Sequence, residues 1–233
     1  MSTGSTSVVD TSQNLEITRI FNLISDHPNK IIVDVGANDG HHLSNSYPLI
    51  QLGWSAVLLE PNPLTYQKAA KLHEGNPRVA ALNLAASNWN GEANLYADSG
   101  GFEGDSTSST LEIGSNEFTD KHIKKDVYIK TRVATLSSLL GAFSNIPRNF
   151  CLLSVDTEGH DLEAIAGLNL SEYRPAYIIT EKHFYDFPKA LKKQQLLTHH
   201  GYACLTIRGS NEIWINTECE YVRAKVGLLH HVA

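Results

Sequence analysis

Two short runs of acids and glycines are the parts of this chain whose residue types could do chemistry. The first, IIVDVGANDGHH at residues 31–42, is an apolar strand that breaks into a Gly-Ala-Asn-Asp-Gly turn. A glycine turn at the end of a strand commonly receives a nucleotide phosphate. Here Asp34 and Asp39 would repel a phosphate, and the side chain of Asn38 would obstruct a pyrophosphate. The turn is therefore predicted to bind a ligand of the opposite charge.

S-adenosylmethionine fits this turn better, because it has no phosphate and carries a cationic sulfonium and a cationic ammonium. Glu60 ends the next apolar run, WSAVLLE, twenty residues after Gly40. An acid at about this distance accepts hydrogen bonds from ribose hydroxyls in nucleoside-binding sheets. The run EPNP then opens a helix, so Pro61 and Asn62 are expected to line the same edge. Gly36 would allow the tight turn and Gly40 the close packing of a helix against the strand.

The second run, SVDTEGHDLEAIAGL at residues 154–168, places Asp156 at the end of an apolar strand and Glu158 and His160 in the turn that follows. Acids near a helix N-terminus can simply stabilise the helix through its dipole, without any chemical role. Titratable groups at the end of a strand in a parallel sheet also suit a ligand site. His160 is the favoured general base for a hydroxyl nucleophile, since its unperturbed pKa lies near neutrality. Glu158 would then hold or orient the substrate, and His183 is a further candidate base.

The run TEKHF at residues 180–184 allows another interpretation of these acids. Asp156, Glu158, Glu181 and His183 come from strand ends that are expected to be adjacent, and together they could hold a hard divalent metal. No spacing among them demands such an ion, so the site is expected to hold no metal.

Apolar runs alternate with helical patterns along the chain, which predicts a parallel sheet covered by helices on both faces. RVAALNLAA at residues 78–86 is expected to form one strand, and YACLTIRGSNEIWIN at 202–216 a C-terminal antiparallel hairpin. The predicted fold is Rossmann-like α/β with a mostly parallel, seven-stranded sheet. Residues 14–233 are expected to form one domain after a flexible arm of residues 1–13. The Gly- and Ser-rich loop at 99–110 could close over a substrate.

Composition and charge narrow the range of partners. The net charge of −6 argues against nucleic acid or an anionic membrane. No apolar run approaches the ~18 residues of a membrane span, and the N-terminus lacks the pattern of a signal peptide. Cys151, Cys204 and Cys219 show no C-x-x-C spacing, which indicates reduced thiols. A small-molecule partner and a cytoplasmic location are therefore expected.

From Ile31 to Tyr202 the sequence resembles the FkbM family of class I S-adenosylmethionine-dependent methyltransferases. The resemblance rests on VDVGANDG, LEPNP, LAASNWNGE, STSSTL, TRVATLSSLL and LLSVDTEGHDLEAIAGL, in that order. It implies transfer of a methyl group to a hydroxyl oxygen on a saccharide or other natural product. One departure is Ser137, which follows Leu136 where the family usually has an acid, so the role of that acid is missing here.

The resemblance also implies which residues bind the cofactor. The methionine part would be cradled by the turn residues Asp34, Gly36, Ala37, Asn38 and Gly40. Ribose would bind Glu60, with Pro61 and Asn62 beside it, and adenine would be bordered by Asn83, Ala85 and Ser87. Asp156 would approach the methionine ammonium or the reacting hydroxyl.

Two other functions remain open on the sequence. A nicotinamide-dependent oxidoreductase could use a similar sheet, although Asn38 and Asp39 at the turn count against it. A non-catalytic module could keep the fold and bind S-adenosylmethionine or its product without turnover. The density of titratable groups at residues 156–160 argues against the second alternative, because a binding protein needs no base.

Overall fold

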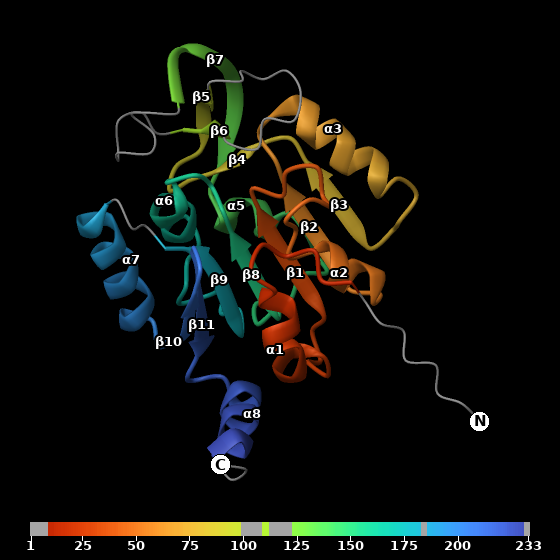
Figure 1. The fold of residues 1–233 in the computed structure, drawn as a ribbon, viewed down its shortest axis with the longest axis vertical. Helices are drawn as coiled ribbons and strands as arrows, with labels where there is room; N and C mark the ends of the chain where they lie inside the picture. Colours follow the sequence, from red (N-terminus) through yellow and green to blue (C-terminus); the bar gives the residue numbers. More distant parts are fainter. Residues whose placement is uncertain (1–8, 99–108, 112–122, 183–185, 231–233) are drawn as a thin grey trace.

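The computed structural model describes residues 9–98, 109–111, 123–182 and 186–230 (Figure 1). Its centre is a seven-stranded sheet in the order β10-β11-β9-β8-β1-β2-β3. Within this sheet β3, β2, β1, β8 and β9 pair in parallel, whereas β11 is antiparallel to both β9 and β10. The prediction of an α/β fold with a large, mostly parallel sheet is thus confirmed. The strands are β1 (Ile31–Val35), β2 (Ser55–Leu59), β3 (Val79–Leu82), β8 (Leu152–Val155), β9 (Tyr177–Glu181), β10 (Tyr202–Arg208) and β11 (Asn211–Asn216).

The strand order reverses beside β1, and this is where an open α/β sheet binds its ligands. From β1 the chain continues to β2 and β3 on one side, and it later returns to β8 and β9 on the other side. In the register of β1 and β8, Asp34 lies opposite Ser154 and Val35 opposite Val155, so Asp156 follows directly at the end of β8. The register therefore brings the two acidic runs of the sequence together.

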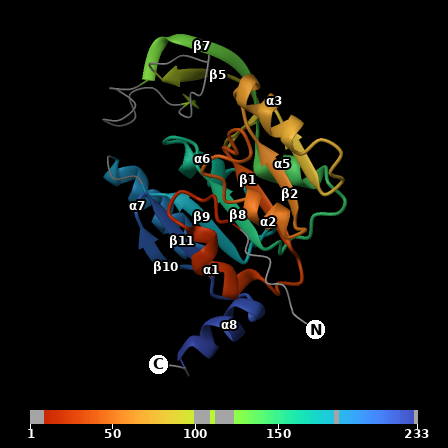
Figure 2. The same ribbon diagram turned by 45° about the vertical axis from the view of Figure 1, so that its right-hand side comes forward.

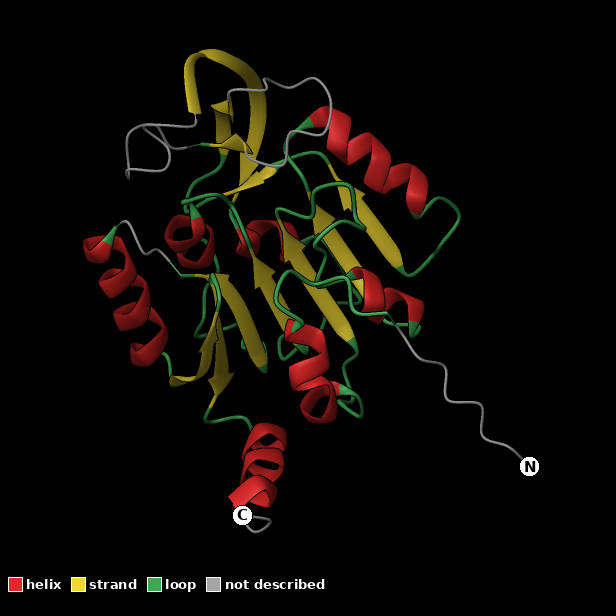
Figure 3. Cartoon of the chain, in the orientation of Figure 1, coloured by secondary structure: helices red, strands yellow, loops and turns green. Residues whose placement is uncertain are grey.

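Helices cover both faces of the sheet (Figure 3). The core on one face includes Ile20 and Leu49 from the first two helices, and the core on the other includes Leu136, Ile165 and Leu197. All of these side chains are almost fully buried, and their burial is the main stabilisation of the sheet. The helices are α1 (Glu16–Ile24), α2 (Tyr47–Gln51), α3 (Pro63–Leu72), α5 (Leu136–Gly141), α6 (Asp161–Ala166), α7 (Phe187–His199) and α8 (Glu220–His230).

A second, four-stranded sheet in the order β4-β7-β5-β6 stands beyond the carboxyl ends of the main strands (Figure 2). The single strand expected at residues 78–86 is wrong, because Asn83 and Leu84 separate β3 in the main sheet from β4 in the second sheet. A two-residue interruption lets the chain leave one sheet and pair in another. The strands of this sheet are β4 (Ala85–Ala86), β5 (Gly91–Asp98), β6 (Ser109–Thr110) and β7 (Ile123–Ala134).

Both chain ends carry structure that the sequence patterns did not indicate. In the arm expected at residues 1–13, the described part is held by side chains: the carboxylate of Asp10 accepts hydrogen bonds from Ser12 and Thr18, and the hydroxyl of Thr11 donates to the carbonyl of Ser44 at 2.9 Å. After the hairpin the chain adds α8. None of the helices in the described ranges has the length and apolar composition of a membrane span.

Candidate active site

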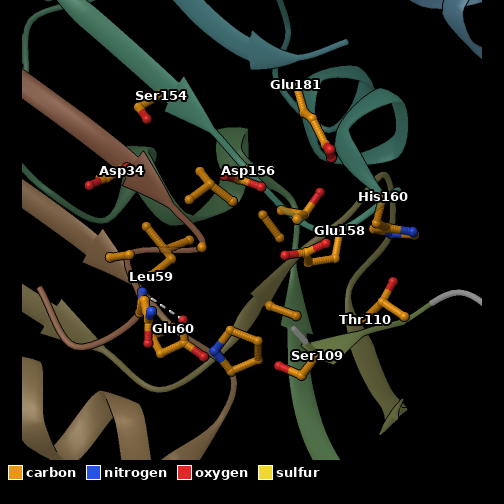
Figure 4. Close-up of a pocket in the computed structure, with 18 of the residues that line it drawn as sticks. Asp34, Leu59, Glu60, Ser109, Thr110, Ser154, Asp156, Glu158, His160 and Glu181 are labelled. Atoms are coloured by element: carbon orange, nitrogen blue, oxygen red, sulfur yellow. Dashed lines mark hydrogen bonds between the residues drawn. The ribbon is translucent and has the colours of Figure 1, made fainter. Parts of the chain in front are cut away.

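A cavity of about 510 Å³ opens at the carboxyl ends of β1, β2, β8 and β9, where the strand order reverses (Figure 4). Its floor comes from the two acidic runs of the sequence, and the second sheet lines it from the other side with Leu95, Ser109 and Thr110. The predicted site residues that line the cavity are Asp34, Gly36, Ala37, Asn38, Glu60, Pro61, Ala85, Asp156, Glu158 and His160. The structure thus brings most of the predicted site together.

The turn after β1 has the backbone shape that its residue types allow. Gly36 has φ +84°, and a Cβ atom there would lie 1.8 Å from the carbonyl oxygen of Asp156, so a side chain has no room. Asn38 has φ +52°, a left-handed conformation that Asn tolerates better than most residues. At Gly40, with φ +76°, an added Cβ would press on Ala69 of α3 at 3.2 Å. Gly40 therefore serves the helix packing that was expected of it and does not line the cavity.

Glu60 holds this turn to the start of α3. Its carboxylate accepts hydrogen bonds from the backbone N–H groups of Asn38 and Asn62, each at 2.8 Å. Burial of the side chain raises the pKa of Glu60 to about 7, because the loss of water outweighs the stabilisation that these two amides give the charged form. The carboxylate faces the cavity, so it can also accept a hydrogen bond from a ligand.

Three predicted cofactor residues, Asn62, Asn83 and Ser87, are not among the residues that line the cavity. Asn62 is the N-cap of α3 and accepts a hydrogen bond from the N–H of Leu64 at 3.0 Å. The amide of Asn83 donates to the carbonyl oxygens of Glu60 and Pro61 at 2.8 and 3.0 Å. The hydroxyl of Ser87 lies 2.9 Å from Nε2 of His160. The side chains of Asn83 and Ser87 thus contact residues that do line the cavity, whereas the side chain of Asn62 serves α3.

Asp39 does not face the cavity, contrary to the expectation that both acids of the first run meet the ligand. Its carboxylate accepts hydrogen bonds from the N–H groups of His41 and His42 at 2.9 and 2.7 Å. A short acidic side chain two residues before free N–H groups commonly closes a turn in this way. Of the two acids in this run, only Asp34 is among the residues that line the cavity.

Three carboxylates converge on the cavity from the end of β8, the following turn and the end of β9: Asp156, Glu158 and Glu181 (Figure 4). Asp156 is surrounded by protein yet open to the cavity, and burial together with the charge of Glu158 raises its pKa well above the usual value. Burial and the charge of Asp156 raise the pKa of Glu181 to about 9. No described residue donates a hydrogen bond to the carboxylate of Asp156 or of Glu181.

The turn that carries these acids depends on Asp161, which the sequence analysis did not select. Asp161 is fully buried. One of its oxygens accepts from the N–H and hydroxyl of Thr157, and the other accepts from the hydroxyl of Thr180 and the N–H of Glu181. This residue ties the β8–α6 turn to the end of β9. Its place as the second aspartate of DTEGHD was the signal that could have identified it.

His160 is 7% exposed and lies at the N-cap position of α6. Its Nε2 atom is the one near the Ser87 hydroxyl, and its Nδ1 atom lies 3.8 Å from the carboxylate of Glu163. Protein groups thus fix the orientation of the ring at the cavity wall. The other predicted base, His183, lies outside the described residues.

The donor and acceptor groups of the cavity fit S-adenosylmethionine. Carboxylates that face the cavity without donors are suited to a cation, and Glu60 offers an acceptor to a ribose. Within the part of the chain that the structure describes, no group of three or more His, Cys, Asp or Glu residues is arranged to hold a metal ion.

The cavity lies where an open, doubly wound α/β sheet binds its ligands, outside the carboxyl ends of the strands at the switch point. The model of the methyltransferase FkbM domain matches residues 34–204, well over half of the chain. The chain belongs to this family, as its sequence motifs indicated. No curated protein matches the chain.

Proposed function

We propose that this chain is an S-adenosylmethionine-dependent methyltransferase that acts on a hydroxyl group of a small molecule, a saccharide or other natural product. Membership of the FkbM family supports methyl transfer in general. The observation that carries the choice of cofactor is the pair of cavity carboxylates, Asp156 and Glu181, that lack donors from the described residues. A ligand that brings a sulfonium and an ammonium relieves the repulsion between these acids.

In this proposal the glycine turn and the strand ends position the cofactor. Glu60 accepts from the ribose hydroxyls, and its hydrogen bonds to two backbone amides keep it aimed at that place. Ala85 and Pro61 border the same part of the cavity. When bound, S-adenosylmethionine supplies the electrophilic methyl group, and the protein contributes the orientation of the acceptor and the removal of its proton.

His160 is the proposed general base, and Glu158 the proposed residue that orients the acceptor. An alcohol is a weak nucleophile at neutral pH, and a positioned base contributes about 10²–10⁴-fold. Because the Ser87 hydroxyl already lies 2.9 Å from Nε2, the acceptor hydroxyl has to displace or share that contact. The carboxylate of Glu163, 3.8 Å from Nδ1 of His160, would stabilise the imidazolium that forms.

Calorimetric titration with S-adenosylmethionine and S-adenosylhomocysteine tests the cofactor. The wild type is expected to bind both, and Glu60→Ala to bind each about tenfold or more weakly through loss of a charged hydrogen bond. The exposed Glu74→Ala serves as the matched control and should bind like the wild type. Binding of NAD(H) in place of either ligand would instead favour an oxidoreductase.

Methyl transfer to a panel of hydroxyl acceptors tests the reaction. His160→Ala is expected to lose turnover while it still binds the cofactor, whereas the exposed His199→Ala retains both. Full turnover by His160→Ala would remove the base assignment. Cofactor binding without turnover on any acceptor would favour the binding-module alternative. The cytoplasmic location stays a prediction from the cysteines.

A further inference from the structure

Two residues that line the cavity lie outside the family domain at 34–204. Gln13 belongs to the segment before α1, and Ser210 to the turn between β10 and β11. Residues that bind a cofactor common to a family are expected within the region that its members share, whereas surface segments differ between members and carry specificity. A cavity wall from outside the shared region is therefore expected to contact the methyl acceptor.

The segment and the turn are joined by direct contacts. The Ser210 hydroxyl donates to Oε1 of Gln13 at 2.7 Å, and the side-chain amide of Asn211 donates to the same oxygen at 3.4 Å. Gly209 has φ +55°, and an added Cβ atom there would collide with the side chain of Asn14, so the turn packs closely on the segment. Residues 13–14 and 209–211 thus form one continuous wall, here called the outer wall.

The hydrogen bonds of the outer wall fix which way the Gln13 amide faces. The side-chain nitrogen of Asn211 also donates to Oε1 of Glu16 at 2.8 Å. Because a carboxylate accepts hydrogen bonds, this atom of Asn211 is a donor, and the Gln13 atom that faces it has to be the oxygen. No hydrogen bond among the described residues uses the N–H groups of Gln13. Gln13 is exposed and lines the cavity, so these two donors are available to a ligand.

The outer wall stands on the β9 side of the cavity. Asn211 lies opposite Glu181 in the register of β11 and β9, and the backbone N–H of Lys182 donates to the carbonyl of Ser210. Glu60, the proposed ribose ligand, follows β2, which is four strand spacings away in the order β11-β9-β8-β1-β2. At about 4.8 Å per spacing the separation is roughly 19 Å. The outer wall is therefore far from the place proposed for the ribose, on the side left for the acceptor.

We propose that the outer wall binds the methyl acceptor, and that the Gln13 amide donates a hydrogen bond to an acceptor oxygen other than the one that is methylated. The inference rests on the proposed function and narrows its substrate class to molecules with at least two oxygen functions, as in a saccharide. An amide N–H selects an oxygen acceptor without requiring a charge. Across the cavity, Ser109 and Thr110 of the second sheet add hydroxyl groups to its lining.

Steady-state kinetics with the methyl glycosides of glucose, galactose and mannose, and with their singly deoxygenated analogues, test this role. Gln13→Glu keeps an oxygen for Ser210 and Asn211 and replaces the N–H donors by a second acceptor oxygen. It should raise the KM of a methylated glycoside about tenfold, as for a lost hydrogen bond, with little change in kcat. The Kd of S-adenosylhomocysteine should not change.

One deoxy analogue should lack the oxygen that Gln13 binds. With that analogue the wild type and Gln13→Glu should have the same KM, because there is no longer a hydrogen bond to lose. Gln13→Ala introduces no charge and should give the same pattern as Gln13→Glu. The exposed Gln195→Glu on α7 is the matched control and should behave as the wild type with every glycoside.

Each contrary result has a distinct meaning. Wild-type protein that does not bind S-adenosylmethionine overturns the proposed function itself. If it binds the cofactor but methylates none of these glycosides, or only acceptors with a single oxygen, the substrate class inferred here is wrong. An unchanged KM in both Gln13 variants means that Gln13 does not contact the acceptor. Weaker binding of S-adenosylhomocysteine, or an equal rise in KM for the glycoside and all its deoxy analogues, means that Gln13 only shapes the cavity, which also overturns the proposal.

Discussion

Glu60→Gln should remove a pH dependence of stability that the wild type shows between about pH 4.5 and 7. Burial raises the pKa of Glu60 in the folded protein from 4.5 to about 7. The folded state therefore holds this proton more tightly than the unfolded chain does. By linkage, stability falls as the pH rises from about 4.5 to about 7, and above that range this group adds no further change. Glutamine resembles the neutral acid in shape and does not titrate.

The size of the effect follows from the burial of Glu60. The residue is 7% exposed, so solvent screening is slight. One pKa unit corresponds to ~1.4 kcal/mol, and a rise from 4.5 to about 7 corresponds to about 3 kcal/mol. The wild type should therefore lose about 3 kcal/mol relative to Glu60→Gln between pH 4.5 and pH 8. Asp156 also has a raised pKa, but it is present in both proteins and cancels in the comparison, whereas the smaller contribution of the Asp34 charge belongs to the Glu60 shift itself.

Urea denaturation of both proteins at pH 4.5, 6 and 8, without ligand, measures this difference. The glutamine amide has one acceptor oxygen for the two backbone N–H groups that Glu60 binds, so Glu60→Gln carries a cost that is the same at every pH. On top of that constant cost, the free energy of unfolding of Glu60→Gln relative to the wild type should rise by about 3 kcal/mol from pH 4.5 to pH 8. The exposed Glu74→Gln is the control and should follow the wild type at each pH. A difference between wild type and Glu60→Gln that stays constant across the three pH values would refute the burial argument.

Three further changes test other parts of the fold. Gly36→Ala should lower the melting temperature strongly, since its Cβ would overlap the Asp156 carbonyl and φ is +84°; a melting temperature like that of the wild type would contradict this. Glu181→Gln should gain stability over the wild type as the pH rises towards 9, because the raised pKa of Glu181 makes its ionisation unfavourable. Thr135→Ala should cost about 1 kcal/mol in urea denaturation, through loss of the α5 N-cap.

The sequence by itself determined the class of fold and the two segments that form the cavity floor. Buried strands alternate with helical patterns, and only a parallel sheet with helices on both faces buries such strands. Because ligands bind at the carboxyl ends of these strands, the acids after the runs at 31–35 and 152–155 pointed to one site. Asp34, Glu60 and Asp156 do line one cavity.

The tertiary structure alone decided how each polar residue is used. Whether an acid meets a ligand or closes a turn depends on which N–H groups lie within reach, and spacing along the chain does not give that. The carboxylate oxygens of Asp39 and Asp161 accept hydrogen bonds from backbone amides and hydroxyls. Those of Asp156 and Glu181 accept none from the described residues and face the cavity.

The second sheet is the other feature that tertiary structure decided. Residues 78–86 read as one apolar strand, because period and composition do not reveal where a chain exchanges one partner strand for another. β3 pairs with β2, and β4 pairs with β7, which is distant in the sequence. These pairings depend on the other segments that fold against each strand. They set Leu95, Ser109 and Thr110 over the strand ends and enclose the cavity.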